Sequence, residues 1–312
     1  MSEVYSTPYI LIFGFILLHS CRKKLGNQID IERNSSKALR GFLALLILTV
    51  HFLDKNIHIT TEIDRAFVAS GFLCVSGFFI FSGYGLYVSY TSKKDYLNNF
   101  GIKTFIKLYV PFSICNIVYY LYHIVTGKIE FSATNFILSF FSNFNTDNSW
   151  YVFVIFACYI IFFVTFANSI TVNKKVLLFC IGVVSFTLLQ ILTFNEFYVS
   201  STFEYLRNFH STLVIIIGLL YAHYSKKVQT PKIRYYPILI CSLLLFVVFY
   251  EWNYISYRFT ITSLFGYEKM VASLLFGNLF VWICIKFDFS KNDLLQKLGG
   301  YRMRYTSFMV CL

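Results

Sequence analysis

The chain has 312 residues, of which 57% are hydrophobic, 21% are aromatic and 13% are charged, and its formal net charge is +12. So apolar a composition excludes an ordinary soluble domain. The positive charge does not indicate a nucleic-acid partner, because most Lys and Arg residues lie in the short connections between apolar runs.

Apolar runs recur along the whole chain, and they are longer than the roughly ten-residue strands of an outer-membrane barrel. A helix needs roughly 20 apolar residues to cross a membrane, with some tolerance at the interfaces. We therefore predict an all-α, polytopic transmembrane helix bundle with about nine complete spans. The runs cover residues 4–19, 39–53, 66–90, 106–125, 150–167, 176–194, 211–224, 236–252 and 270–287. A further segment, 131–144, has the pattern of an amphipathic helix.

The Lys and Arg residues predict how these spans alternate. If the connection at 20–40 is cytoplasmic, alternation places 21 of the 27 Lys and Arg residues on the cytoplasmic side. Such a bias is the usual orientation signal of a multi-pass protein. The pattern predicts a chain embedded in lipid with an extracytoplasmic N-terminus. The heavy use of Ile, Phe, Lys, Asn and Tyr is typical of a low-GC bacterium, so we expect the chain in the inner membrane of a bacterial cell.

Domain organisation is expected to be simple. We predict an extra N-terminal span with its cytoplasmic connection at 1–34, followed by one membrane domain at 35–312. No internal repeat or Pro-rich linker marks a further boundary. The eight cysteines lack CxxC or CxxH spacing, so we interpret them as small buried residues rather than metal ligands.

The second run begins near Arg40 and ends near His51, with ten mostly apolar residues between them. Eleven helical steps of 100° complete three turns plus about 20°, so both side chains lie on one face, about 16 Å apart along the axis. A polar pair on an apolar helix needs a polar cavity, a partner or the interface. Either residue alone has a simpler explanation, as a snorkelling arginine or an interfacial histidine.

Four further motifs follow in chain order. They are SGFFIFSGYGL at 76–86, FIKLYVPF at 105–112, NSWYVFVIFACYI at 148–160 and LLQKLGGY at 294–301. Together with Arg40 and His51, this series resembles the acyltransferase-3 family of integral membrane O-acyltransferases over roughly residues 35 to 300. The matching positions are Arg40, His51, Phe78, Phe79, Ser82, Gly83, Tyr84, Lys107, Leu108, Tyr109, Pro111, Trp150, Tyr151 and Val152.

The sequence departs from the family pattern at two places. Thr104 and Lys107 stand where many relatives have an Arg-x-x-Arg pair, and lysine keeps the charge but lacks the bidentate fork of arginine. Relatives continue into a final span, whereas twelve residues follow Gly300 here. We therefore expect a tenth span to be missing or truncated, and an inactive truncated remnant is one alternative to an active enzyme.

The resemblance implies transfer of an acyl group, usually acetyl, from cytoplasmic acetyl-CoA to a hydroxyl of a cell-surface or lipid-linked polysaccharide. Arg40, Lys103 and Lys107 are then the expected contacts for the phosphates of the donor. His51, at the opposite end of its span, is expected to act with Arg40 in catalysis, either as a general base or as a transient acyl carrier. No metal is implied.

Other residues near these motifs have less specific roles. Ser82, Tyr84 and Trp150 are expected to line the substrate path, while Phe78, Phe79 and Gly83 are interpreted as helix-packing residues. His123 and His210 are predicted near the outer face, where they could bind substrate, but an interfacial position explains them more simply. The candidates for orienting His51 are Glu196, Glu204, Glu251 and Glu268.

A transporter of polysaccharide or lipid-linked sugars is a second alternative. Polar residues inside spans would then line a pathway. Transporters of this kind carry intramembrane acids or broken helices in paired halves. This chain has four prolines and no acid clearly within a predicted span, which favours the enzyme.

Overall fold

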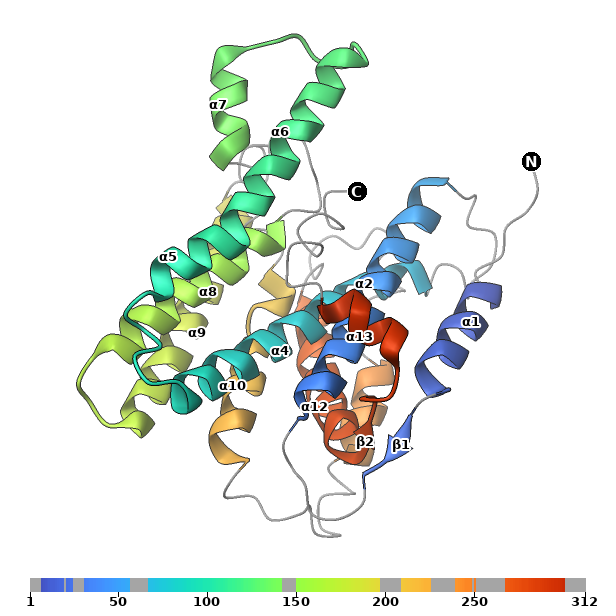
Figure 1. The fold of residues 1–312 in the computed structure, drawn as a ribbon, viewed down its shortest axis with the longest axis vertical. Coiled ribbons are helices and arrows are strands. Elements are labelled where there is room, and N and C mark those ends of the chain that lie inside the picture. Colours follow the sequence, from blue (N-terminus) through green and yellow to red (C-terminus); the bar gives the residue numbers. More distant parts are fainter. Residues whose placement is uncertain are drawn as a thin grey trace. The chain divides into compact units, whose positions relative to one another are not determined.

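The computed structural model describes residues 7–19, 21–24, 31–56, 67–141, 150–196, 209–225, 239–248, 250 and 267–300. Within these residues the chain is almost wholly helical, with one short two-stranded ribbon (Figure 1). Five of the described helices are long and apolar enough to cross a membrane, and shorter apolar helices lie at Tyr151–Ala167, Val214–Tyr224 and Leu239–Val248. The predicted helical membrane class is confirmed, while the count of nine spans stays a prediction. The predicted truncation concerns residues 301–312, outside the described residues.

The chain forms two compact units. Unit 1 contains Met1–Ser89 and His210–Tyr301, and unit 2 contains Tyr90–Phe209 and Arg302–Leu312. The helices of unit 1 include α1 (Thr7–Leu18), α2 (Arg33–Asn56), most of α4 (Gly71–Ser92), α10 (Val214–Tyr224), the helix Leu239–Val248, α12 (Tyr267–Lys286) and α13 (Asp293–Gly300). The 3-10 helix η3 (Phe209–Ser211) precedes α10, and its last two residues belong to unit 1. Its strands are β1 (Arg22–Lys23) and β2 (Phe287–Asp288).

Helix α4 runs antiparallel to α2. A Cβ added at Gly71 would lie 3.1 Å from Cγ1 of Val50, and one added at Gly77 would meet the side chain of Leu43. Later residues of α4 therefore lie beside earlier residues of α2. This direction agrees with the alternation predicted for the second and third spans.

Helices α10 and α12 run parallel to α4, because residues that come later in one helix contact residues that come later in the others. The defining pairs are Ser76–Ser211 and Tyr87–His223 for η3 and α10, and Phe72–Ala272 and Phe81–Phe280 for α12. The seventh and ninth predicted spans were expected to cross in the same direction as the third, and these contacts agree with that order.

The crossing of α4 and α10 depends on two glycines. A Cβ added at Gly83 would overlap the carbonyl oxygen of Ile215, and one added at Gly218 would overlap that of Ile80. Helix α12 joins at the same level, because Gly277 lies against side chains of both α4 and α10. Small residues let helix backbones approach closely in membrane proteins. The predicted packing role of Gly83 is confirmed.

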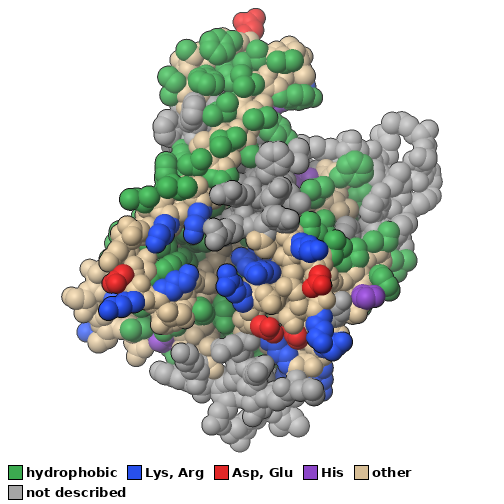
Figure 2. All heavy atoms as spheres, viewed as in Figure 1, with side chains coloured by type: hydrophobic (Ala, Val, Ile, Leu, Met, Phe, Trp, Pro, Cys, Tyr) green, Lys and Arg blue, Asp and Glu red, His purple; other side chains and the backbone are tan. Residues whose placement is uncertain are grey.

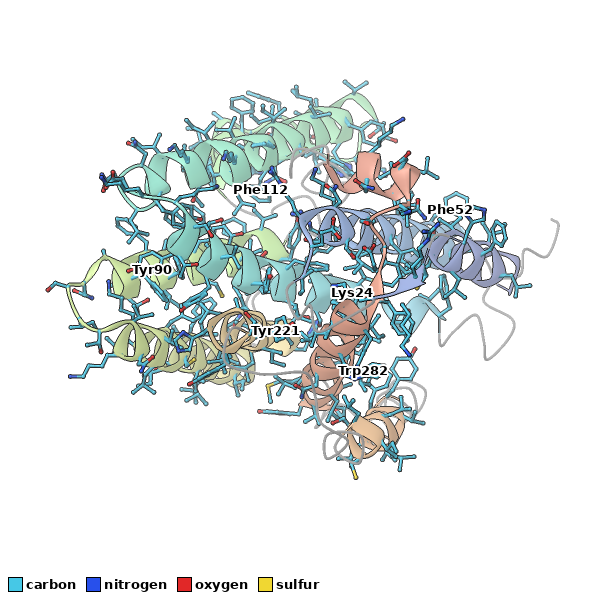
Figure 3. The ribbon with its side chains drawn as sticks, turned by 60° about the horizontal axis from the view of Figure 1, so that its bottom comes forward. Lys24, Phe52, Tyr90, Phe112, Tyr221 and Trp282 are labelled. Carbon is cyan, nitrogen blue, oxygen red and sulfur yellow. The ribbon has the colours of Figure 1, made fainter. Side chains whose placement is uncertain are left out.

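The all-α prediction missed the ribbon of unit 1. Strands β1 and β2 pair antiparallel, with Arg22 opposite Asp288 and Lys23 opposite Phe287. Lys24, labelled in Figure 3, extends this contact by donating from Nζ to the carbonyl oxygen of Cys284 at 3.0 Å. The ribbon is too short for a sequence pattern, since each strand has two residues.

Helix α13 lies across the first half of α2 (Figure 1). A Cβ added at Gly299 would overlap the carbonyl oxygen of Lys37, and one added at Gly41 would overlap that of Leu295. The side chain of Asn292 caps α13, accepting from the backbone N–H of Leu295 at 3.1 Å. The LGG part of the last sequence motif is therefore a contact surface for α2.

We expect Gly299→Ala to destabilise the protein by roughly 1–3 kcal/mol, because the new Cβ collides with backbone rather than with a movable side chain. Gly300→Ala is the matched control, since its Cβ would lie 3.7 Å from Cδ of Lys37, an ordinary contact. Thermal unfolding of the purified full chain in detergent measures both. Equal melting temperatures for the two variants would contradict this account of the α2–α13 contact.

Unit 2 contains a continuous helical segment made of α5 (Phe100–Thr104), the π-helix η1 (Phe105–Tyr109) and α6 (Val110–Val125). It also contains α7 (Ala133–Phe141), α8 (Trp150–Ala167) and α9 (Val172–Glu196). The helix predicted within 131–144 is therefore present as α7. Tyr120 connects α6 to Ser132, the residue before α7. Its hydroxyl oxygen lies 2.9 Å from the backbone nitrogen of Ser132 and 2.9 Å from the carbonyl oxygen of the same residue.

Aromatic rings join α8 to the α5–α6 segment in antiparallel order. The pairs are Phe100–Phe162, Tyr109–Phe156 and Phe112–Phe153. Helix α9 then reverses direction, and the buried Lys175 at its start donates to the carbonyl oxygen of Phe166, near the end of α8, at 2.9 Å. Figure 2 shows hydrophobic side chains covering the α6–α7 end of unit 2, as expected for a surface in contact with lipid.

Candidate active site

Arg40 and His51 lie on one uninterrupted helix, α2, as their spacing requires. Both side chains are half-buried, and Ala44 and Ile47, which lie between them on the same face, are 6% and 4% exposed. The Nε–H of Arg40 donates to the carbonyl oxygen of Ser36 at 3.2 Å. This face of α2 is therefore a covered surface with a polar group at each end.

Tyr84 lies near the Arg40 end of α2 and has a structural partner. Its hydroxyl accepts from the backbone N–H of Ile31 at 3.1 Å, just before α2 begins. Its ring stacks on Tyr221 of α10, labelled in Figure 3, with the centroids 5.9 Å apart. The residue thus joins the entry of α2 to α10.

Ser82 is buried but does not share a face with Tyr84. Two helical steps place these side chains about 200° apart around α4, so they point to nearly opposite sides. Ser82 and Tyr84 therefore cannot line a single path in unit 1 from the same face of α4.

His223 and Tyr87 form a contact that the sequence analysis did not identify. The hydroxyl of Tyr87 lies 2.6 Å from Nδ1 of His223, and the two rings meet edge to face at 5.2 Å. Tyr84 and Tyr87 are three residues apart, so they approach α10 from neighbouring positions on α4. The spacing of the two tyrosines indicates that they share a face of α4. Nothing in the sequence links Tyr87 to His223, which lies 136 residues later.

Lys103 and Lys107 lie in unit 2 and are both exposed. Lys103 is in the last turn of α5, and Lys107 is in the π-helix η1. The N–H of Val110 donates to the carbonyl oxygen of Phe105, five residues earlier, and Pro111, which has no N–H to donate to the carbonyl of Lys107, follows directly. The basic motif of the sequence therefore coincides with a local change in helical winding, a feature often found at functional sites.

Trp150 is the first residue of α8. Of the candidates for orienting His51, Glu204 and Glu251 lie outside the described residues and Glu196 ends α9 in unit 2. Glu268 lies in the first turn of α12 in unit 1 and is 5% exposed.

His210 is buried by other parts of the chain, whereas its predicted interfacial position in the membrane stays a prediction. It lies in η3, before the apolar helix α10, and is 6% exposed. Its ring meets that of Phe72 edge to face, with the centroids 5.7 Å apart. Burial, reinforced by the positive charge of Lys269, lowers the pKa of His210 from 6.5 to about 3. The imidazole of His210 is therefore neutral near pH 7, when it can hydrogen-bond but is a weak base.

The described part of unit 1 therefore has polar groups at two levels. At one end lie Arg40, Tyr84 and the basic connections, and Figure 2 shows Lys and Arg side chains gathered around α13. At the other end lie His51, His210 and the start of α12. Among the described residues, no group of His, Cys, Asp and Glu could hold a metal ion.

Comparison with known proteins gives one match. The family model described as an acyltransferase domain, that of the acyltransferase-3 family, matches residues 33–303. The matched region begins where α2 begins and includes all the motifs identified in the sequence. No curated protein and no solved structure matches the chain. The match covers most of the chain, so the protein belongs to the acyltransferase-3 family and is a membrane acyltransferase.

Proposed function

We propose that the protein is an O-acetyltransferase of the bacterial inner membrane. It transfers an acetyl group from cytoplasmic acetyl-CoA to a hydroxyl of a cell-surface or lipid-linked polysaccharide. The main support is the position of Arg40 and His51 at the two ends of one buried face of α2, in a chain of the acyltransferase-3 family. The distribution of Lys and Arg supports a cytoplasmic Arg40 end and an extracytoplasmic N-terminus.

In this proposal the donor is held through its phosphates by Arg40, Lys103 and Lys107. Arginine offers five N–H donors in a planar fork, of which the Nε–H of Arg40 is directed to Ser36. Lys103 and Lys107 contribute exposed charges that attract a polyanion without the geometry of an arginine fork. Acetyl-CoA is a co-substrate here, and no metal is required.

His51 handles the proton of the acceptor hydroxyl. In the direct route, the imidazole accepts that proton while the hydroxyl oxygen attacks the thioester carbonyl. The new C–O bond forms, the C–S bond breaks, and coenzyme A leaves as a thiolate that is then protonated. In the two-step route, His51 first takes the acetyl group from the thioester and then passes it to the hydroxyl. Both routes require the neutral imidazole.

Ser82 and Trp150 are proposed to line the path between the two ends. Tyr84 is proposed to act on that path indirectly, because its hydroxyl accepts from Ile31 and its ring stacks on Tyr221. It would thereby hold the start of α2, and with it Arg40, in place.

The test is the O-acetyl content of surface polysaccharide from cells that carry the chain or an empty vector. We expect an acetyl signal in the proton NMR spectrum of the first sample, and its loss after mild base, which cleaves esters but not amides. Membrane expression is checked by immunoblot. Identical spectra from cells that express the chain and from vector controls, for both isolated polysaccharide and lipid-linked sugars, would count against the proposal.

A further inference from the structure

A group of buried polar residues lies at the His51 end of unit 1 and has no role in the mechanism above. Val50, which precedes His51, contacts Gly71 at the start of α4. Phe72 follows, and its ring meets the imidazole of His210, while Nζ of Lys269 lies 6.0 Å from its centroid. His51, His210 and Lys269 therefore lie at the same level of the helix bundle, around the start of α4.

Buried charges at this level call for an explanation. Glu268 is 5% exposed, and the ammonium of Lys269 lies over an aromatic face in the first turn of an apolar helix. Ionisable side chains in such positions are costly and usually mark a substrate or ion site. An ion pair between Glu268 and Lys269 would explain these two charges. It would not explain Ser273, the next residue on the same face of α12 as Lys269.

Ser273 is that residue, four positions after Lys269 on α12. Its side chain is 0% exposed, and among the described residues its hydroxyl has no hydrogen-bond partner. Hydroxyls inside helices usually donate to the carbonyl four residues earlier. Within the described helices, the hydroxyls of Thr49, Ser76, Thr165 and Thr187 do so, at 2.8–3.0 Å. Leaving a buried hydroxyl unpaired costs stability, so Ser273 is a site where a ligand would supply the missing bond.

The position of Ser273 points toward His210. Lys269, Ser273 and Gly277 follow one another at intervals of four residues, so they share a face of α12. Gly277 lies against Val214 and Ile217 of α10. The face therefore points to α10, and Ser273, one turn nearer the start of α12, lies at the level of η3, which carries His210 and precedes α10.

We infer that His210, Lys269 and Ser273 form the subsite that binds the hydroxyl acceptor beside His51, an inference that rests on the proposed transferase function. The ligand class is a polyhydroxylated sugar. The Ser273 hydroxyl and the imidazole of His210 exchange hydrogen bonds with sugar hydroxyls, and the ammonium of Lys269 donates to a sugar oxygen. None of the three takes the reacting proton, which goes to His51. The low pKa of His210, about 3, suits a residue that binds hydroxyls without deprotonating them.

The test measures acetyl transfer by the purified full chain from radiolabelled acetyl-CoA. The acceptor is host surface polysaccharide from which mild base has removed the ester groups, and its concentration is varied at saturating donor. We expect Ser273→Ala to raise the KM for this acceptor roughly 2- to 10-fold, the value of one lost hydrogen bond, and to leave the KM for acetyl-CoA unchanged. Its melting temperature should stay the same or rise, because the removed hydroxyl has no internal partner. Lys269→Met is expected to raise the acceptor KM as well.

Ser211→Ala is the matched control. The Ser211 hydroxyl is also 0% exposed, but it lies 2.9 Å from the hydroxyl of Ser76, so its loss should lower the melting temperature and leave the acceptor KM unchanged. Wild-type transfer with an unchanged acceptor KM in both Ser273→Ala and Lys269→Met would overturn the subsite alone. An equal rise in Ser211→Ala would also overturn it, by showing that any disturbance of this region weakens acceptor binding. No transfer by the wild-type chain would overturn the proposed function, and the subsite with it.

Discussion

Replacing His51 by alanine is expected to lower the rate of acetyl transfer by about 100-fold or more. General acid–base catalysis by a positioned side chain contributes roughly 10²–10⁴-fold, and an acyl carrier would contribute at least as much. Alanine removes the imidazole from a helix whose neighbouring core residues, such as Ile47 and Val50, are unchanged. The loss should therefore appear in kcat rather than in the melting temperature. The measurement is transfer of radiolabelled acetyl from acetyl-CoA to polysaccharide by purified variants.

His19→Ala provides the control for this prediction. His19 is exposed, makes an edge contact with Phe15 at 5.3 Å, and lies before the region matched by the family. Its loss should leave transfer within about twofold of wild type, since surface substitutions have small effects. Full activity of the His51→Ala variant would rule out both chemical routes proposed for this residue.

The same variants separate the two routes. If His51 is an acyl carrier, the wild-type chain incubated with labelled acetyl-CoA and no acceptor should hold covalent label, and His51→Ala should not. If His51 is a general base, neither chain holds label.

The second large effect is expected at the α4–α10 crossing. Gly83→Ala should destabilise the protein by roughly 1–3 kcal/mol or more, because the added Cβ overlaps the carbonyl oxygen of Ile215 and lies 3.0 Å from the N of Leu219. Both atoms belong to the backbone of α10, so relief requires the helices to separate. A melting temperature lower by roughly 2–5 °C is the expected result in detergent, given the entropy of unfolding of a chain of this length.

Gly85→Ala tests whether this effect is due to the crossing. Gly85 lies on the same helix two residues later, and nothing is within 4 Å of an added Cβ. Alanine also favours the helix over glycine by roughly 1 kcal/mol, so this variant should be as stable as wild type or more stable. A destabilisation of Gly85→Ala equal to that of Gly83→Ala would show that the cost comes from α4 itself and not from its contact with α10.

The sequence by itself determined the class of the protein and the local position of its helices. Helix α8 begins and ends at the predicted residues 150 and 167, because an unbroken apolar run must satisfy its own backbone hydrogen bonds in lipid. Helix α2 begins earlier than its apolar run, at Arg33, because polar residues extend a helix beyond the membrane at no desolvation cost. The shared face of Arg40 and His51 also follows from local geometry, since 100° per residue applies to any uninterrupted helix.

Only the tertiary structure decided which helices meet and what each polar residue contacts. The burial of His210 against Phe72, the bond from Ile31 to Tyr84 and the close approach of Gly299 to the backbone of Lys37 join residues far apart in the chain. A sequence pattern reports the period of one helix and the side of the membrane. It carries no information on the rotation of one apolar helix against another, because lipid and protein surroundings select the same residue types. The neutral state of His210 and the unpaired hydroxyl of Ser273 depend on that rotation, so the predicted acceptor subsite could be identified only after the helices were placed.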